Sequence, residues 1–222
     1  MDRLRRFLYK HPNFGVPNLM LYIAAGNVLV FLLDLFSSGS FSPMISFIPA
    51  MIFRGQVWRL LTFVFVPVAS SPLFFVLSVV LYYFLGAQLE RAWGSGRFTV
   101  YYGLGVLFNV VLGLALGLTA WRDYPVVNMY YVNMSLFFAF ATLYPDAQFM
   151  VFFIIPVKAK WLAWLDAALF LYEVIRLIAA GAYLLALVPV AAVANYLIFF
   201  WDEIAGLLRL PRLKSTPTAR WI

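Results

Sequence analysis

The stretch LGAQLERAWGSGRFTVYY, residues 85–102, decides how the chain is divided. It ends one hydrophobic run, residues 72–89, and begins another, residues 98–120. Between the two runs lies a short turn that is rich in glycine and in charged residues. The stretch therefore predicts a tight polar junction between two membrane helices.

The side chains of this turn indicate how it is held. Gly94 and Gly96 allow backbone conformations that a Cβ would disfavour. Glu90 can accept hydrogen bonds from Arg91, from Arg97 or from the free amides of the turn. We expect these contacts to be structural.

The composition places the chain in a membrane. Of 222 residues, 65% are hydrophobic and only 11% are charged, which is too little polar surface for a soluble domain. This length allows one domain of about five to seven helical spans. The chain has no cysteine and one histidine, His11 in the N-terminal tail. We therefore expect no disulfide, no metal site and no cofactor.

The hydrophobic runs predict six spans joined by short loops. We place the spans at residues 17–36, 72–89, 98–120, 126–144, 161–177 and 182–201. Residues 41–71 are apolar but are broken by proline, glycine and arginine, which favours short amphipathic pieces in the membrane interface. Residues 147–157 are apolar but too short to cross. Basic tails, residues 1–16 and 206–222, flank a membrane domain over residues 17–205.

The basic residues predict the orientation of the spans. The formal net charge is +7, and four basic residues precede the first span while four follow the last. Such clusters are typical of topology signals and of contacts to anionic lipid rather than to nucleic acid. We expect both termini in the cytoplasm, the lipid bilayer as a partner and no nucleic acid. The small size and the absence of a transit-like leader favour a bacterial plasma membrane.

Three motifs carry a resemblance to a known family. They are Gly-Gln-Val-Trp-Arg-Leu-Leu-Thr at residues 55–62, the junction at residues 85–98, and Leu-Tyr-Pro at residues 143–145. In this order and spacing the chain resembles the rhomboid superfamily of intramembrane serine proteases and their inactive relatives. The resemblance implies an all-α membrane protein, a bundle of six transmembrane helices with an interfacial first loop. Its structural motif residues would be Trp58, Arg59, Glu90, Gly94, Gly96 and Arg97.

The residues that carry catalysis in that family are missing. Rhomboid proteases place a serine within Gly-x-Ser-Gly at the start of the fourth span and a histidine on the sixth. The chain has no glycine between Gly117 and Gly181, and the position of the serine falls near Tyr130. The sixth span has no histidine, and Asn195 is its most polar residue. The resemblance therefore implies a pseudoprotease, which like the derlins keeps the scaffold without the dyad, and no catalytic residue.

The family's oxyanion donors are replaced too. At the comparable positions of the second span this chain has Phe74 and Ser78. We expect the bulky side chains of Tyr130, Tyr131 and Phe137 to fill the space that a substrate backbone would need.

Several polar residues remain inside the predicted spans, and such residues are costly and often functional. The candidates are Asn133, Ser135, Asp166 and Asn195. Glu173 and Arg176 are three residues apart and are expected to pair. For Asp166 two roles stay open: it makes a packing contact, or it is a functional group.

The working hypothesis is a non-catalytic multi-pass protein that binds transmembrane segments of other proteins as clients. Client identity and oligomeric state are not predicted. One alternative is an unconventional serine protease built around Ser135. A second is a small transporter or channel that uses Asp166, Asn133 and Asn195, although no internal repeat supports it.

Overall fold

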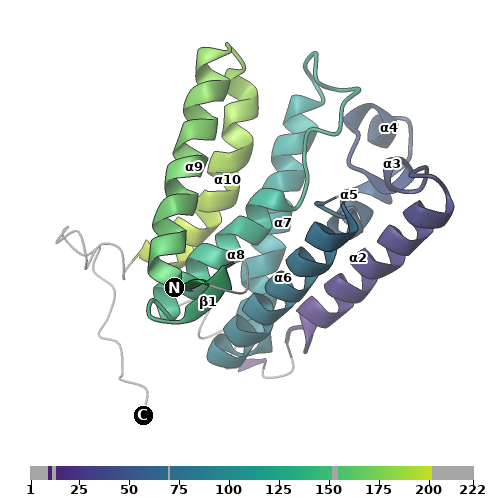
Figure 1. Cartoon of the computed structure of the whole chain (residues 1–222). Helices are drawn as coiled ribbons and strands as arrows, with labels where there is room; N and C mark the ends of the chain where they lie inside the picture. Colours follow the sequence, from purple (N-terminus) through teal and green to yellow (C-terminus); the bar gives the residue numbers. More distant parts are fainter. Residues whose placement is uncertain (1–9, 12–13, 70, 152–154, 202–222) are drawn as a thin grey trace.

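The computed structural model describes residues 10–11, 14–69, 71–151 and 155–201, which form a bundle of long helices with a small hairpin at one end (Figure 1). The long helices are α2 (Leu19–Phe36), α6 (Pro72–Trp93), α7 (Ser95–Leu116), α8 (Tyr130–Leu143), α9 (Ala159–Ala179) and α10 (Tyr183–Phe199). The expected C-terminal tail, residues 206–222, and most of the N-terminal tail lie outside the described residues.

The first loop contains only short helical pieces. These are α3 (Ser42–Ile45), α4 (Pro49–Phe53), α5 (Arg59–Thr62) and the 3₁₀ turn η1 (Phe63–Phe65). Prolines stand in the first turns of α3 and α4, where the missing amide hydrogen is not needed. The short pieces agree with the expectation for residues 41–71.

The protein is mainly helical, and the long helices lie where the hydrophobic runs predicted them. Within the described residues, three of them, α2, α6 and α7, are long and apolar enough to cross a membrane. The helices α8 and α10 are apolar but shorter, with 14 and 17 residues. The helix α9 has 21 residues and carries four charged side chains. A multi-pass helical membrane protein is therefore shown, with three spans defined by length and composition.

Helix α8 lies at the centre of the bundle. Nine of its 14 residues are buried, and it packs against α6, α7, α9 and α10. At a rise of about 1.5 Å per residue it is only about 21 Å long. The expected span began at residue 126, but residues 117–129 form turns and a loop, held by an antiparallel bridge between Phe47 and Val127. This bridge joins the first loop to the start of α8.

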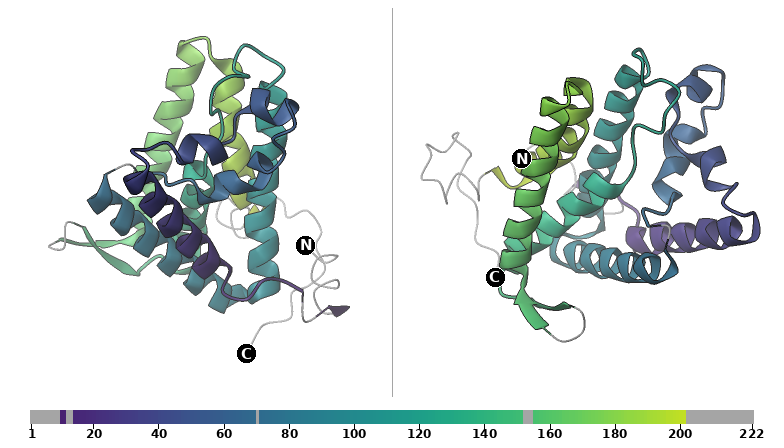
Figure 2. Two further views of the ribbon diagram at one scale, coloured as in Figure 1. Left: turned by 90° about the vertical axis from the view of Figure 1, so that its right-hand side faces the viewer. Right: turned by 45° about the horizontal axis from the view of Figure 1, so that its top comes forward.

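The other helices form two groups around α8. Helices α2 and α6 lie side by side, as Figures 1 and 2 both show. Helix α10 packs on α7, α8 and α9. Among the described elements, α9 makes extended contacts only with α10, α8 and the strand β2. Helix α9 therefore stands at the edge of the bundle.

The hairpin was not expected from the sequence. Strands β1 (Gln148–Val151) and β2 (Ile155–Lys158) pair antiparallel, so Phe149 lies opposite Val157. The Phe149 ring packs on Phe137 and Phe140 of α8. The segment over residues 147–157, expected as an apolar piece too short to cross, forms this hairpin in its described part. The strands form because β-branched and aromatic residues suit a pleated, half-buried surface.

Candidate functional site

Ser135, the serine considered as an unconventional nucleophile, is buried between helices. Its hydroxyl donates to the carbonyl of Val132 at 2.7 Å. The Tyr101 hydroxyl of α7 donates to the Ser135 carbonyl at 2.9 Å and lies 3.2 Å from the Ser135 hydroxyl. The exposed fraction of Ser135 is zero. These contacts make Ser135 a packing residue between α7 and α8, in reach of no histidine among the described residues.

Asn195 belongs to the same cluster. Its Nδ2 donates to the carbonyl of Tyr101 at 2.7 Å and so ties α10 to α7. Gly105 of α7 makes this approach possible, because a Cβ there would lie 3.3 Å from Asn195 Nδ2 and 3.2 Å from Val132 Cγ1. The sequence did not single out Tyr101, although its hydroxyl and carbonyl join three helices. Nothing in the one-dimensional pattern distinguishes it from Tyr102.

Arg59 organises the first loop. Its exposed fraction is 6%, whereas that of Trp58 is 52%. Its Nη1 donates to the carbonyls of Pro43 and Ser46 at 2.8 and 2.7 Å, and its Nε donates to Gln56 Oε1 at 2.7 Å. A guanidinium carries five donors in a fixed plane and can hold several acceptors at once. Arg59 thus joins α3 to α5.

The junction between α6 and α7 is held by a segment far away in the chain. Gly94 has a positive φ of 80° and separates the two helices. Glu90 Oε1 accepts from the amide of Asn18 at 2.7 Å, rather than from the turn itself as expected. A Cβ on Gly15 would lie 2.6 Å from the Cα of Gly96. Residues 15–18 therefore dock on this junction, and Gly96 leaves room for them.

Arg97 completes the junction. Its guanidinium carbon lies 5.3 Å from the centre of the Trp93 ring. The Trp93 ring in turn packs on Phe199 and Phe200 at the end of α10. The junction motif therefore fastens the end of α10 to the turn between α6 and α7.

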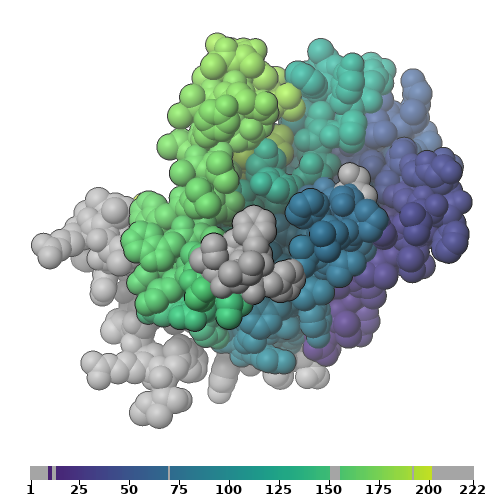
Figure 3. All heavy atoms as spheres, viewed as in Figure 1, coloured from purple at the N-terminus to yellow at the C-terminus, as the bar shows by residue number. Residues whose placement is uncertain are grey.

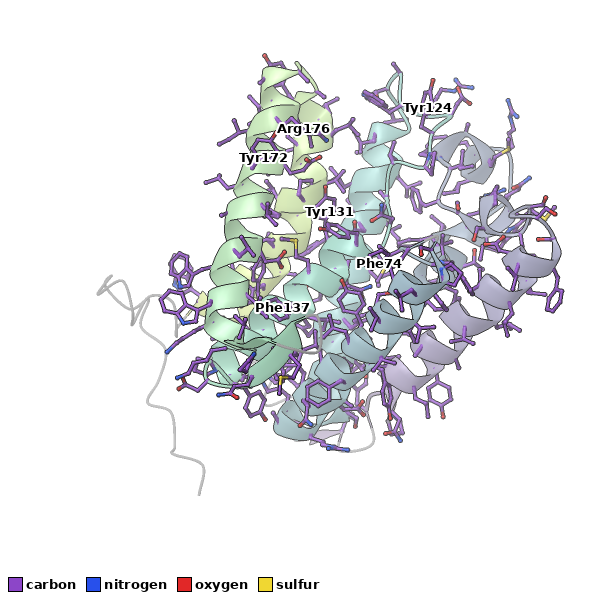
Figure 4. The ribbon with its side chains drawn as sticks, in the orientation of Figure 1. Phe74, Tyr124, Tyr131, Phe137, Tyr172 and Arg176 are labelled. Atoms are coloured by element: carbon purple, nitrogen blue, oxygen red, sulfur yellow. The ribbon has the colours of Figure 1, made fainter. Side chains whose placement is uncertain are left out.

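Helices α6 and α9 both pack on α8, and we call the surface of α8 between them the lateral groove. Helix α8 forms its floor, because α8 packs on both helices while α6 and α9 make no extended contact with each other. In the space-filling view α8 is visible between the green α9 and the blue α6 (Figure 3). Figure 4 places Tyr131 of α8 and Phe74 of α6 in this region. Phe74 is 64% exposed.

Two acids of α9 lie within electrostatic range of Tyr130: Glu173, which pairs with Arg176, and Asp166. Asp166 is half-buried, and its carboxylate lies within electrostatic range of the hydroxyls of Tyr82 on α6 and Tyr130 on α8. Tyr130 is 45% exposed. Tyr131 packs on Phe170 of α9, and Phe137 packs on Phe149 of the hairpin.

A small cavity lies behind the groove, between α2, α6 and α8. Its volume is about 30 Å³, and its polar lining includes Asn27, Ser78, Tyr82 and Asn133. That volume suffices for about one water molecule. The Oδ1 of Asn133 is buried and has no hydrogen-bond partner among the described residues. Asn133 thus faces a polar space rather than joining two helices directly.

Comparison with known proteins adds one finding. A family model described as eukaryotic integral membrane protein (DUF1751) matches residues 18–206. No curated protein and no solved structure matches the chain. The matched family is eukaryotic, so the expectation of a bacterial plasma membrane is wrong. It rested on chain size and on the absence of a leader, and neither property specifies which membrane holds a bundle of apolar helices.

Proposed function

Because the chain belongs to the family of eukaryotic integral membrane proteins (DUF1751), we propose that it is a rhomboid-like pseudoprotease that binds transmembrane helices of other proteins without cutting them. In this proposal all six long helices lie within the bilayer and the first loop lies in its interface. The groove between α6 and α9 receives the client helix from the side.

The observation that carries the proposal is that α6 and α9 both pack on α8 but make no extended contact with each other. Helices that pack in a bilayer gain nothing from excluding water, because lipid tails are as apolar as their side chains. Binding there depends on shape, close packing and hydrogen bonds. The groove offers a buried floor in α8, exposed apolar side chains on both walls, and the polar groups of Asp166 and Tyr130. These features suit a single apolar helix with a polar residue.

The site geometry supports binding without cleavage. A serine protease needs a nucleophile, a base and oxyanion donors that converge within about 3 Å of one reacting atom. Ser135 is buried and hydrogen-bonded to Tyr101, and Asn195 donates to the backbone of Tyr101. Tyr130, in the groove, has a phenol hydroxyl and no histidine among its described neighbours.

The test is a disulfide crosslinking map in lipid nanodiscs. The chain has no cysteine, so one introduced cysteine is unique. Phe74→Cys and Tyr130→Cys place it in the groove, and Tyr22→Cys places it on α2, where Tyr22 is 62% exposed. A client helix with a single cysteine should crosslink to the groove positions at least fivefold faster than to the α2 control. Equal rates at all three positions would remove the groove as the binding site.

A further inference from the structure

We infer that the groove selects client helices that carry one basic residue, lysine or arginine, at the depth of Asp166. This inference rests on the proposed function, because it names the class of helix that the groove receives.

Asp166 stands apart from the other charged residues of its helix. Glu173 forms an ion pair with Arg176, and Lys160 pairs with Asp146 at 3.2 Å. The carboxylate of Asp166 has no ion pair and no hydrogen bond with any residue in the described part of the chain. An isolated carboxylate in an apolar medium is costly and is usually compensated by a partner.

The surroundings of Asp166 favour a cation as that partner. The polar groups within its electrostatic range are the hydroxyls of Tyr82 and Tyr130, which can donate hydrogen bonds but carry no positive charge. Tyr82 and Asn133 also line the cavity behind the groove, and the Oδ1 of Asn133 has no hydrogen-bond partner among the described residues. A lysine or arginine side chain brings only donors, which the carboxylate of Asp166 can accept. A second carboxylate would meet repulsion from Asp166.

The position of Asp166 fixes the depth of the basic residue. Asp166 lies seven residues after Ala159, the first residue of α9, which corresponds to about 10 Å along the helix axis. Lys158 and Lys160 mark the membrane face at that end, together with the exposed Trp161. A long basic side chain can extend along a helix surface by several ångströms. The preferred client residue therefore lies about one third of the way across, on the side of the hairpin.

The test uses synthetic leucine–alanine helices of about 22 residues with one guest residue, lysine, leucine or glutamate. Binding to the full-length protein in nanodiscs is measured by energy transfer, with the guest moved one turn at a time across the helix. The lysine helix should bind at least tenfold more tightly than the leucine helix, with an optimum about 10 Å from the hairpin face. The glutamate helix should bind most weakly.

Variants of the acid isolate its role. Asp166→Asn keeps the shape of the side chain and should reduce the lysine preference to less than twofold. Asp166→Lys should reverse the preference in favour of glutamate, which a merely misfolded protein could not do. Glu173→Gln, which removes the other acid of α9, is the matched control and should leave the lysine preference unchanged.

Two results would overturn the inference. The first leaves the proposed function intact, and the second removes it as well. If lysine and leucine helices bind equally and both crosslink to Phe74→Cys, the groove binds helices but does not select a basic residue. If no helix crosslinks to the groove, both the inference and the proposed function are wrong.

Discussion

Replacing Arg59 by alanine removes the guanidinium that holds the first loop together. The variant loses three hydrogen bonds, two to the carbonyls of Pro43 and Ser46 and one to Gln56. A hydrogen bond from a charged donor contributes about 1.5–3 kcal/mol, and water can replace part of that at acceptors which are only partly buried. With about 1 kcal/mol for each bond, the free energy of unfolding should fall by about 3 kcal/mol.

The expected fall in melting temperature is about 6–12 °C for a chain of this size. Intrinsic tryptophan fluorescence during heating of the protein in detergent reports it, since the chain contains seven tryptophans. Arg59→Lys should lie between wild type and Arg59→Ala, because a single ammonium cannot hold all three acceptors. Arg54→Ala is the control in the same loop, because Arg54 is exposed, and it should melt within about 2 °C of wild type. If Arg59→Ala and Arg54→Ala melt together, Arg59 does not hold the loop.

Two further predictions concern the ends of the helices. Gly15→Ala should lower the melting temperature more than Gly39→Ala: both glycines have positive φ, but only at Gly15 would a Cβ meet backbone, 2.6 Å from Gly96 Cα. Equal losses in the two variants would mean that the N-terminal segment does not dock on the junction. Lys158 and Lys160 hold the pKa of the Asp146 carboxyl below its usual value. The ionised carboxylate therefore stabilises the hairpin above about pH 4, and this stabilisation is lost as the pH falls through the lowered pKa. Asp146→Asn should therefore speed amide exchange in β1 at neutral pH, with a difference from wild type that shrinks below about pH 3; a constant difference would contradict the ion pair's role.

The sequence was a good guide to the long helices and to the first loop. Each apolar run of sufficient length became a helix, since the backbone must satisfy its own hydrogen bonds in lipid. The prolines and arginines of residues 41–71 excluded a span there, and the structure has only short turns of helix in that segment. The spacing of Glu173 and Arg176 likewise predicted their ion pair.

Contacts between distant segments could not be predicted in the same way. The amide of Asn18 and the carboxylate of Glu90 meet across 72 residues of chain, and no periodicity shows that they are neighbours. The hairpin strands have four residues each, and a short apolar run can be either strand or helix by pattern alone. The groove arises from how α9 packs at the edge of the bundle, which hydropathy does not specify.

The partners of the candidate polar residues also had to come from the structure. Asn133, Ser135 and Asn195 are of similar polarity in the sequence, but their surroundings differ. Ser135 and Asn195 hydrogen-bond within one buried cluster around Tyr101, whereas Asn133 lines a cavity with an unpaired oxygen. The polarity of a residue indicates that a partner is needed, and only the fold determines which one it finds.

The most direct test of the central claim is the intact mass of a client helix after binding. A lysine-containing client is disulfide-trapped in the groove through Phe74→Cys in proteoliposomes, incubated for several hours, released by reductant and weighed by mass spectrometry. If the protein binds helices without cutting them, the client is trapped in the groove and released at its full, unaltered mass. Recovery of two fragments whose masses sum to that of the client plus one water would show that the protein hydrolyses the helix it binds, and would contradict the account.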